Sequence, residues 1–140
     1  MADVEAVCSD TVMDRVFQMV DCMAERDGRG ATALYQEMLA NKVEPFRLLA
    51  LISSKFNSIL QVRELQRAHM GTDEIRARLS LHPFVIKKCT EWSRKYTDEQ
   101  LTQILASCAE CSLLIKWGKM TDAAAIESLI VGCTLGMSSV

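Results

Sequence analysis

Residues 44–52 read Glu-Pro-Phe-Arg-Leu-Leu-Ala-Leu-Ile, and they begin the longest predicted helix of the chain. Pro45 stands at the first helical position, where its missing N–H leaves no hydrogen bond unmade. The apolar residues that follow cover most of the circumference of the helix, which predicts burial on several sides. The second half of the helix runs to about His69 and opens a polar face made of Gln61, Arg63, Glu64 and Arg67. We therefore predict a central helix against which the other elements pack.

Six further helices are predicted from apolar residues at three- and four-residue spacing and from capping residues. They cover residues 10–26, 31–40, 72–79, 83–96, the stretch between the capping box at Thr97 and Gly118, and 121–133. No stretch alternates convincingly with a period of two, so the predicted fold class is all-α, a single helical bundle of about six to seven helices. Residues 10–131 are expected to form the domain, with 1–9 flexible or left from cloning and 132–140 a fraying tail.

The size and composition are those of one globular domain. The chain has 140 residues, of which 49% are hydrophobic and 24% are charged. A hydrophobic core that needs no disulfide bond or structural metal is therefore feasible. The acidic N-terminal stretch lacks the apolar region of a signal peptide, and the longest apolar runs are far shorter than a membrane span. The six cysteines fall at apolar helical positions and are predicted to be reduced thiols of the core. We therefore expect a cytoplasmic protein without membrane association.

The charge is unevenly placed along the chain. Residues 1–43 carry a net charge of −4, residues 44–96 of +5 and residues 97–140 of −3. A basic middle between acidic ends is typical of a chain with a charged partner, and equally of a solvated helix surface that happens to be basic. If DNA is that partner, non-specific phosphate contact would come from Arg63, Arg67, Lys87, Lys88, Arg94 and Lys95.

The sequence offers little catalytic chemistry. It contains no P-loop, no Gly-x-Ser-x-Gly and no His-Glu-x-x-His, so no cofactor, no metal and no enzymatic activity are predicted for this chain by itself. Cys108 and Cys111 form a Cys-x-x-Cys in mid-helix without a second pair, which favours core packing over zinc or redox use. His82 lies seven residues before Cys89 as a conceivable nucleophile pair, although a cap or packing role is the simpler interpretation. An enzyme using these residues is the weakest hypothesis.

Residues 72–79, a short turn and residues 83–96 have the pattern of a helix-turn-helix. A recognition helix needs Arg, Asn or Gln near its start to read base edges. Here the first turn is apolar, Pro83-Phe84-Val85-Ile86, and such a tip is expected to be buried. Sequence-specific readout is therefore disfavoured, while a DNA-binding domain of this type remains the alternative functional hypothesis.

The two tryptophans are predicted to differ. Trp92 lies on the apolar line of its helix and is expected in the core. Trp117 stands at a helix end between Lys116 and Gly118-Lys119, where an aromatic flanked by lysines suits a subunit interface made of Lys116, Trp117 and Lys119. A local contact at the helix end explains Trp117 equally well.

Four sequence motifs, taken in their order along the chain, resemble those of one protein family. They are Glu44-Pro45 opening a long helix, Gln61–Leu65 near its end, the run Leu79–Lys88 with His82-Pro83-Phe84 at its centre, and Ile115–Gly118. This order is similar to the C-terminal domains of bacterial DNA polymerase III delta subunits. Two positions depart from that pattern, Ser112 in place of an aspartate and Trp117 in place of a small residue. The residues that carry the resemblance are Glu44, Pro45, Leu81, His82, Pro83, Phe84, Lys87, Lys88, Ile115, Lys116 and Gly118.

The resemblance implies a scaffold role. The delta subunit is a non-ATPase component of the clamp loader, which loads the sliding clamp onto DNA in replication. Its C-terminal domain would join the collar through oligomerisation with the ATPase subunit and delta-prime. Contact with the sliding clamp would belong to an N-terminal AAA+-like module that nothing in this chain matches. DNA polymerisation would belong to the DNA polymerase III assembly.

Overall fold

The computed structural model describes the backbone of residues 2–41 and 43–134, and side chains within these ranges from Val12 onward. Seven helices occupy them and no strand does, which confirms the all-α prediction. The helices are α1 (Ala2–Ala24), α2 (Gly28–Leu39), α3 (Pro45–Arg67), α4 (Thr72–Leu79), α5 (Pro83–Ser93), α6 (Asp98–Lys116) and α7 (Asp122–Thr134).

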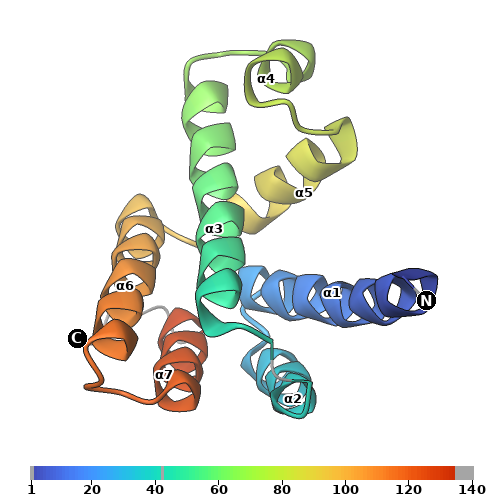
Figure 1. Ribbon diagram of the computed structural model, residues 1–140. Coiled ribbons are helices and arrows are strands. Elements are labelled where there is room, and N and C mark those ends of the chain that lie inside the picture. The colour runs from blue at the N-terminus through green and yellow to red at the C-terminus, as the bar shows by residue number, and fades with distance from the viewer. Residues whose placement is uncertain (1, 42, 135–140) are drawn as a thin grey trace.

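Helix α3 runs through the centre of the molecule, as Figure 1 shows. One half of α3 is flanked by the α1–α2 pair on one side and by α6 and α7 on the other, while α4 and α5 lie beside its other half. Helix α7 also contacts α1 and α2, so the N-terminal and C-terminal helices meet beneath the central helix. The prediction of a central helix is therefore correct.

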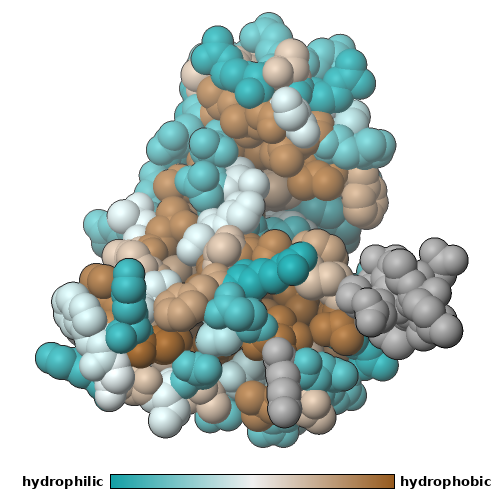
Figure 2. Space-filling view, in the orientation of Figure 1, coloured by the Kyte–Doolittle hydropathy of each residue, from teal (hydrophilic) through white to brown (hydrophobic). Residues whose placement is uncertain are grey.

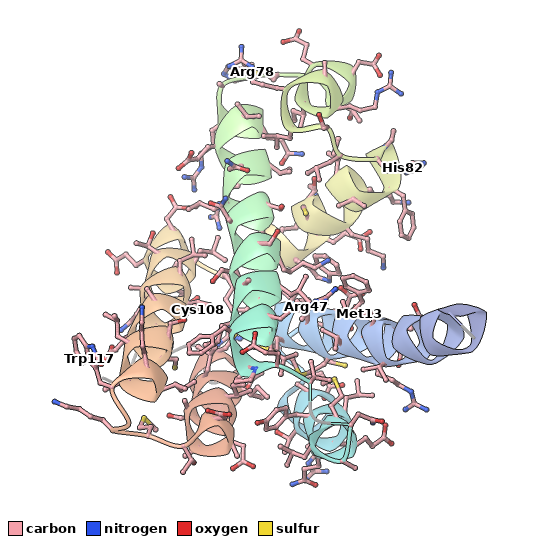
Figure 3. The ribbon with its side chains drawn as sticks, viewed as in Figure 1. Met13, Arg47, Arg78, His82, Cys108 and Trp117 are labelled. Carbon is pink, nitrogen blue, oxygen red and sulfur yellow. The ribbon has the colours of Figure 1, made fainter. Side chains whose placement is uncertain are left out.

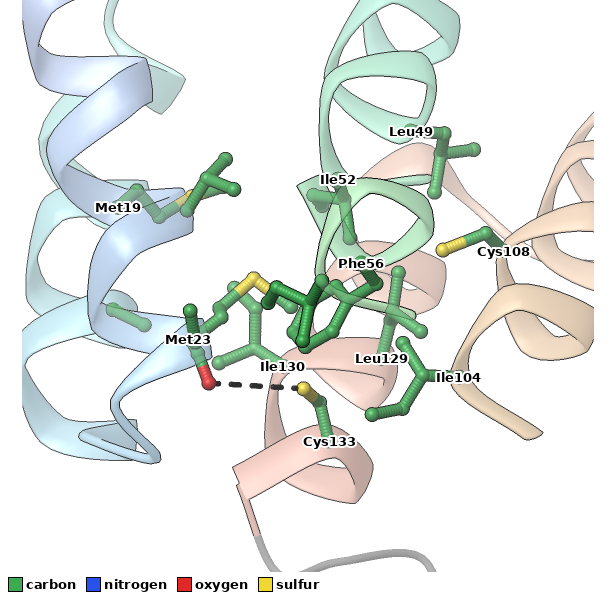
Figure 4. Packing of buried hydrophobic residues seen from close by; sticks show 14 of the residues in the cluster. Met19, Met23, Leu49, Ile52, Phe56, Ile104, Cys108, Leu129, Ile130 and Cys133 are labelled. Atoms are coloured by element: carbon green, nitrogen blue, oxygen red, sulfur yellow. Dashed lines mark hydrogen bonds between the residues drawn. The ribbon is translucent and has the colours of Figure 1, made fainter. Parts of the chain in front are cut away.

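The buried part of the circumference of α3 is narrower than the apolar first half of this helix predicts. Phe46 is 41% exposed and Ala50 is exposed, so this half is not buried on all sides. The buried residues form one broad stripe instead, Leu48, Leu49, Ile52, Phe56, Ile59 and Val62. Figure 4 shows part of this stripe against side chains of α1, α6 and α7. Removing such side chains from water stabilises the fold by roughly 1.5–3 kcal/mol each.

Several helix boundaries differ from the predicted ones. Helix α1 begins at Ala2 rather than Asp10, so the backbone of residues 2–9 is helical. Helix α5 ends at Ser93 rather than Tyr96, because the Arg63 side chain bonds the carbonyls of Ser93 and Tyr96 beyond it. The predicted fraying at 132–134 is wrong, since α7 continues through these residues. The rest of the predicted tail, 135–140, lies outside the described residues.

Tyr96 joins the ends of α1, α5 and α7 to the middle of α3. Its hydroxyl donates a hydrogen bond to the carbonyl of Met23 at the end of α1, and it lies 3.6 Å from Cys133 Sγ on α7. The ring packs edge-on against Phe56 of α3, with centroids 5.6 Å apart. The Arg26 guanidinium carbon lies 5.2 Å from the ring centroid, and the same group donates to the carbonyl of Lys95, beyond the end of α5. Burial raises the pKa of Tyr96, so the phenol keeps its proton and its donor role.

We expect Tyr96→Phe to lower the free energy of unfolding by about 1 kcal/mol, because the buried Met23 carbonyl loses this donor. The matched control is Tyr35→Phe. Both tyrosines are 3% exposed, but no hydrogen bond of the Tyr35 hydroxyl is found within the described residues. Urea unfolding followed by circular dichroism measures both variants. Equal losses for the two would contradict the role of Tyr96.

Helix α2 begins earlier than predicted, at Gly28 instead of Ala31, and it does so through its cap. The Asp27 side chain accepts a hydrogen bond from the backbone N–H of Gly30 at 3.0 Å. A Cβ on Gly30 would lie 2.4 Å from Asp27 Oδ2 and 3.1 Å from Cys22 Sγ. A glycine is therefore required at position 30 by the carboxylate that caps the helix.

Gly30→Ala is expected to displace the Asp27 cap and cost about 1–2 kcal/mol of stability. Gly71→Ala is the matched control, because a Cβ there meets nothing within 4 Å. Thermal denaturation of both variants, together with Asp27→Ala, separates the effects. The losses of Gly30→Ala and Asp27→Ala should overlap rather than add. Full additivity would show that the contact of the new Cβ with Cys22 Sγ, not the loss of the Asp27 cap, sets the cost of Gly30→Ala.

Candidate subunit interface

Helix α6 is started by the predicted capping box. The Thr97 hydroxyl accepts from the Gln100 N–H at 3.1 Å, and the Thr97 N–H donates to Gln100 Oε1 at 2.9 Å. One side of α6 packs against α3 and α7. Its buried residues are Leu101, Ile104, Cys108 and Cys111. These residues fix which side of α6 faces solvent.

The opposite side of α6 is unusual for a solvent-facing helix because it carries several apolar residues among its polar ones. We call the residues Thr102, Ala106, Ala109, Leu113 and Trp117 the outer face of α6; all are exposed, as are Glu99 and Glu110 on the same side. Leu113 is 45% exposed and Trp117 is 63% exposed. Figure 3 shows the Trp117 side chain directed away from the bundle. A solvent-facing stripe of this kind is typical of a surface that packs against another protein.

The end of α6 presents the residues that the sequence predicted for an interface. Trp117 caps the helix, and Gly118 follows with φ +71°, a conformation that favours glycine. Lys119 Nζ lies 6.0 Å from the Trp117 ring centroid, in a solvent-exposed cation–π contact. Neither Lys116 nor Lys119 forms an ion pair within the described ranges. The structure thus brings the three predicted residues together, beside Leu113.

The His82-Pro83-Phe84 stretch starts α5. His82 Nδ1 accepts a hydrogen bond from the Phe84 N–H at 3.0 Å, and Pro83 occupies the first helical turn. The simpler interpretation of His82 as a cap is therefore correct. Phe84 is 61% exposed, so the expectation that this apolar tip is buried is wrong for Phe84, although Ile86 is buried. Figure 2 shows apolar surface around α4 and α5, bordered by hydrophilic residues.

Three other family positions have local structural roles. Glu44 caps α3 by accepting from the N–H groups of Phe46 and Arg47. Leu81 and Ile115 are half-buried against the core. These roles explain the residue types without any ligand.

The predicted DNA contacts divide into two groups. Arg63 and Arg67 both pair with Asp98, with Arg63 Nε 3.3 Å from Asp98 Oδ1 and Arg67 bonded to Oδ2, although the Arg67 side chain is 53% exposed. Asp98 Oδ1 is shielded from solvent, and this ion pair is its only contact within the described residues. The two arginines therefore tie α3 to the start of α6, and the single carboxylate offsets one of their two positive charges.

The other group lies on and after α5. Lys88 Nζ is 3.8 Å from Glu91 and 5.9 Å from the Phe84 ring centroid, and Lys95 donates to the carbonyl of Glu25. Lys87 and Arg94 are exposed and form no ion pair within the described ranges. These two side chains are therefore available to a phosphate backbone.

Asp98→Asn is expected to lower the melting temperature at neutral pH. The Arg67 hydrogen bond, aided by the charges of Arg67 and Arg63, lowers the pKa of Asp98 from its ordinary value of 3.8. The contribution is therefore complete above that value and is lost as the pH falls through the lowered pKa. Melting curves of the variant and the parent should converge once the pH has fallen below the lowered pKa of Asp98.

Asp73→Asn serves as the control, because Asp73 also stands in the first turn of a helix but has no arginine partner within the described residues. A pH-independent difference between Asp98→Asn and the parent would contradict the ion-pair interpretation.

The cysteines with described side chains are free thiols, and four of the five are buried. Burial raises the pKa of Cys89 and of Cys108 to about 11, which opposes thiolate formation. Cys111 Sγ donates to the carbonyl of Ala125 at 3.6 Å. His82 caps the helix start about 10 Å along the axis from Cys89, too far for a nucleophile pair. The interpretation of Cys108 and Cys111 as core residues agrees with this packing.

No cluster of three possible metal ligands occurs in the described part of the chain. Within the same residues, no helix combines the length and the apolar character that crossing a bilayer requires.

Most of the outer face of α6 was not predicted from the sequence. Trp117 was identified, but Ala106, Ala109 and Leu113 were not. The signal was present, because positions opposite the buried stripe of an amphipathic helix are normally polar. Here Ala106, Ala109, Leu113 and Trp117 stand among the polar residues Glu99, Thr102 and Glu110.

The seven helices define an all-α domain built around one central helix. Residues 13–133 match the family model for the C-terminal domain of the DNA polymerase III delta subunit, and the chain therefore belongs to this family. It is 24% identical over 129 residues to DNA polymerase III subunit delta of Bacillus subtilis (strain 168). The solved structure of the Bacillus subtilis DNA clamp loader delta protein matches with a TM-score of 0.76 at 24% identity, over 88% of this chain, and supports the fold.

The chain spans only part of these relatives. It covers 37% of the length of the Bacillus subtilis protein and 36% of the solved structure, while 92% of this chain takes part in the first match. What is shown is therefore membership of the C-terminal domain family.

Proposed function

We propose that this domain is a collar element of a clamp loader, which joins its subunit to neighbouring subunits through the outer face of α6. The observation that carries the proposal is the exposed pair Leu113 and Trp117, continued along the helix by Ala106 and Ala109. Small residues allow a partner helix to approach closely, and a Leu–Trp pair at one end offers the large contact area typical of hot spots.

The partners in this proposal are the ATPase subunit and delta-prime, in keeping with the family. Lys116 and Lys119 flank the apolar face without an ion pair in the described residues, so they favour a partner with carboxylates at the edge of its own helix. The domain contributes scaffolding rather than catalysis in this role. Contact with the sliding clamp is assigned to an N-terminal module beyond the matched region.

Direct DNA binding is the second candidate, favoured only by exposed basic groups. Lys87 and Arg94 on and after α5 are joined by Arg76 and Arg78 of the neighbouring α4, all of them exposed. The first turn of α5 carries no side chain that reads a base edge. Any contact would therefore go to the phosphate backbone, with strong salt dependence and no sequence preference.

Trp117→Ala is expected to weaken binding to the cognate ATPase and delta-prime subunits about thirtyfold, the effect of losing a hot-spot aromatic. Size-exclusion chromatography with light scattering establishes the stoichiometry, and titration calorimetry measures the affinity. Leu113→Asp should abolish the complex, because it buries a charge in the apolar face.

The matched control is Phe84→Ala, which removes an aromatic that is 61% exposed but lies on α5, at the other end of the molecule. It should leave the affinity unchanged. If the parent chain forms no complex with its cognate subunits, the scaffold proposal fails. If the complex forms and tolerates Leu113→Asp, the role of α6 fails while the scaffold proposal stands.

A further inference from the structure

A pocket of about 390 Å³ opens where α2, the start of α3 and the start of α7 meet. Its size falls in the range of sites that accept a large side chain or a small ligand. The polar groups at the pocket are Tyr35, Glu44 and Asp122. The remaining lining residues are apolar: Met38, Leu39, Val43, Pro45, Leu48 and Ile126. An apolar floor with a few polar groups is the composition expected of a binding site.

The rim of the pocket is acidic. Asp122 and Glu127 are exposed on α7 and form no ion pair within the described residues. Burial, followed by the charges of Glu127 and Asp122, raises the pKa of Tyr35, so both carboxylates act on the pocket wall. The Glu44 carboxylate is already bonded to two N–H groups of its own helix. The free negative charge therefore comes from α7.

Two side chains of the pocket are reached by water. Leu39 is 46% exposed at the end of α2, although it adjoins the apolar floor. The Tyr35 side chain is 3% exposed, but its hydroxyl oxygen is not fully buried, so water reaches it. An incoming group that is apolar at its base would cover Leu39, and a polar group at its tip would replace that water.

We propose that this pocket receives a bulky apolar side chain from the neighbouring subunit, with a lysine or arginine of the same segment against Asp122 and Glu127. The charge of the rim selects a basic segment. This inference rests on the proposed collar function for the identity of its partner. Asp122 follows Trp117 by five positions, a span of at most about 18 Å. A partner that covers Trp117 therefore has the pocket within reach.

The first test measures the chemical preference of the pocket without any partner. The full chain, with labelled methyl groups, is titrated with 4-phenylbutylamine and with 4-phenylbutyrate, two probes that share the phenyl group and differ in charge. Methyl resonances of Met38, Leu48 and Ile126 should shift, and the amine should bind about fivefold to tenfold more tightly than the acid.

The combined variant Asp122→Asn with Glu127→Gln should remove this preference. Glu99→Gln, at the opposite end of α6 from Trp117, is the control with a like loss of charge and should retain it. Equal binding of the two probes, or shifts confined to methyl groups outside the pocket, would overturn the inference.

The second test uses the complex with the ATPase and delta-prime subunits. Val43→Phe places bulk in the pocket from the loop before α3 and should weaken the complex at least tenfold, with thermal denaturation confirming the fold. Full affinity in Val43→Phe, combined with loss of affinity in Leu113→Asp, would reject the pocket and keep the collar proposal. Loss of the complex only with Val43→Phe would support the pocket and reject the role of α6.

Discussion

The arrangement of the bundle depends on the contacts around Tyr96. This residue lies just beyond α5, yet its hydroxyl reaches the last turn of α1, its ring packs on α3, and Cys133 of α7 lies beside it. Arg26 completes the junction by bonding the carbonyls of Lys95 and Thr134. Helix ends leave carbonyl groups without partners, and here they are satisfied by side chains from elsewhere in the chain. The ends of α1, α5 and α7 are therefore fixed relative to α3.

This junction also separates charge in space. The acidic N-terminal and C-terminal stretches meet because α7 contacts α1 and α2, while the basic middle of the chain forms the remainder of α3 with α4 and α5. Two arginines of that basic middle are held by Asp98 and close the boundary with α6. An uneven charge distribution in the sequence thus becomes an acidic end and a basic end of the molecule, and the acidic end includes the pocket beside α7.

The sequence predicted best those helix starts that carry a local signal, while the starts of α1 and α2 lie earlier than predicted. Pro45, Pro83 and the Thr97 capping box mark their starts through local chemistry that any sequence shows. The ends of α1 and α3 use Arg26 and His69 in the left-handed conformation, φ 64° in each case, where glycine is expected. At Arg26 the tertiary bonds to Lys95 and Thr134 outweigh the local preference. Gly30 lies inside α2 because the Asp27 cap requires close approach, and a Cβ on Gly28 would lie 2.8 Å from Thr134 Oγ1.

The candidate interface shows the same limit of prediction. Trp117 was recognisable because it is large and flanked by lysines, whereas Ala106, Ala109 and Leu113 are ordinary helix residues until the buried side of α6 is known. Once Leu101, Ile104, Cys108 and Cys111 face inward, the opposite positions must meet either water or a partner. A leucine and a tryptophan together in water gain nothing for the isolated domain. Their exposure is therefore the feature on which the proposed subunit contact depends.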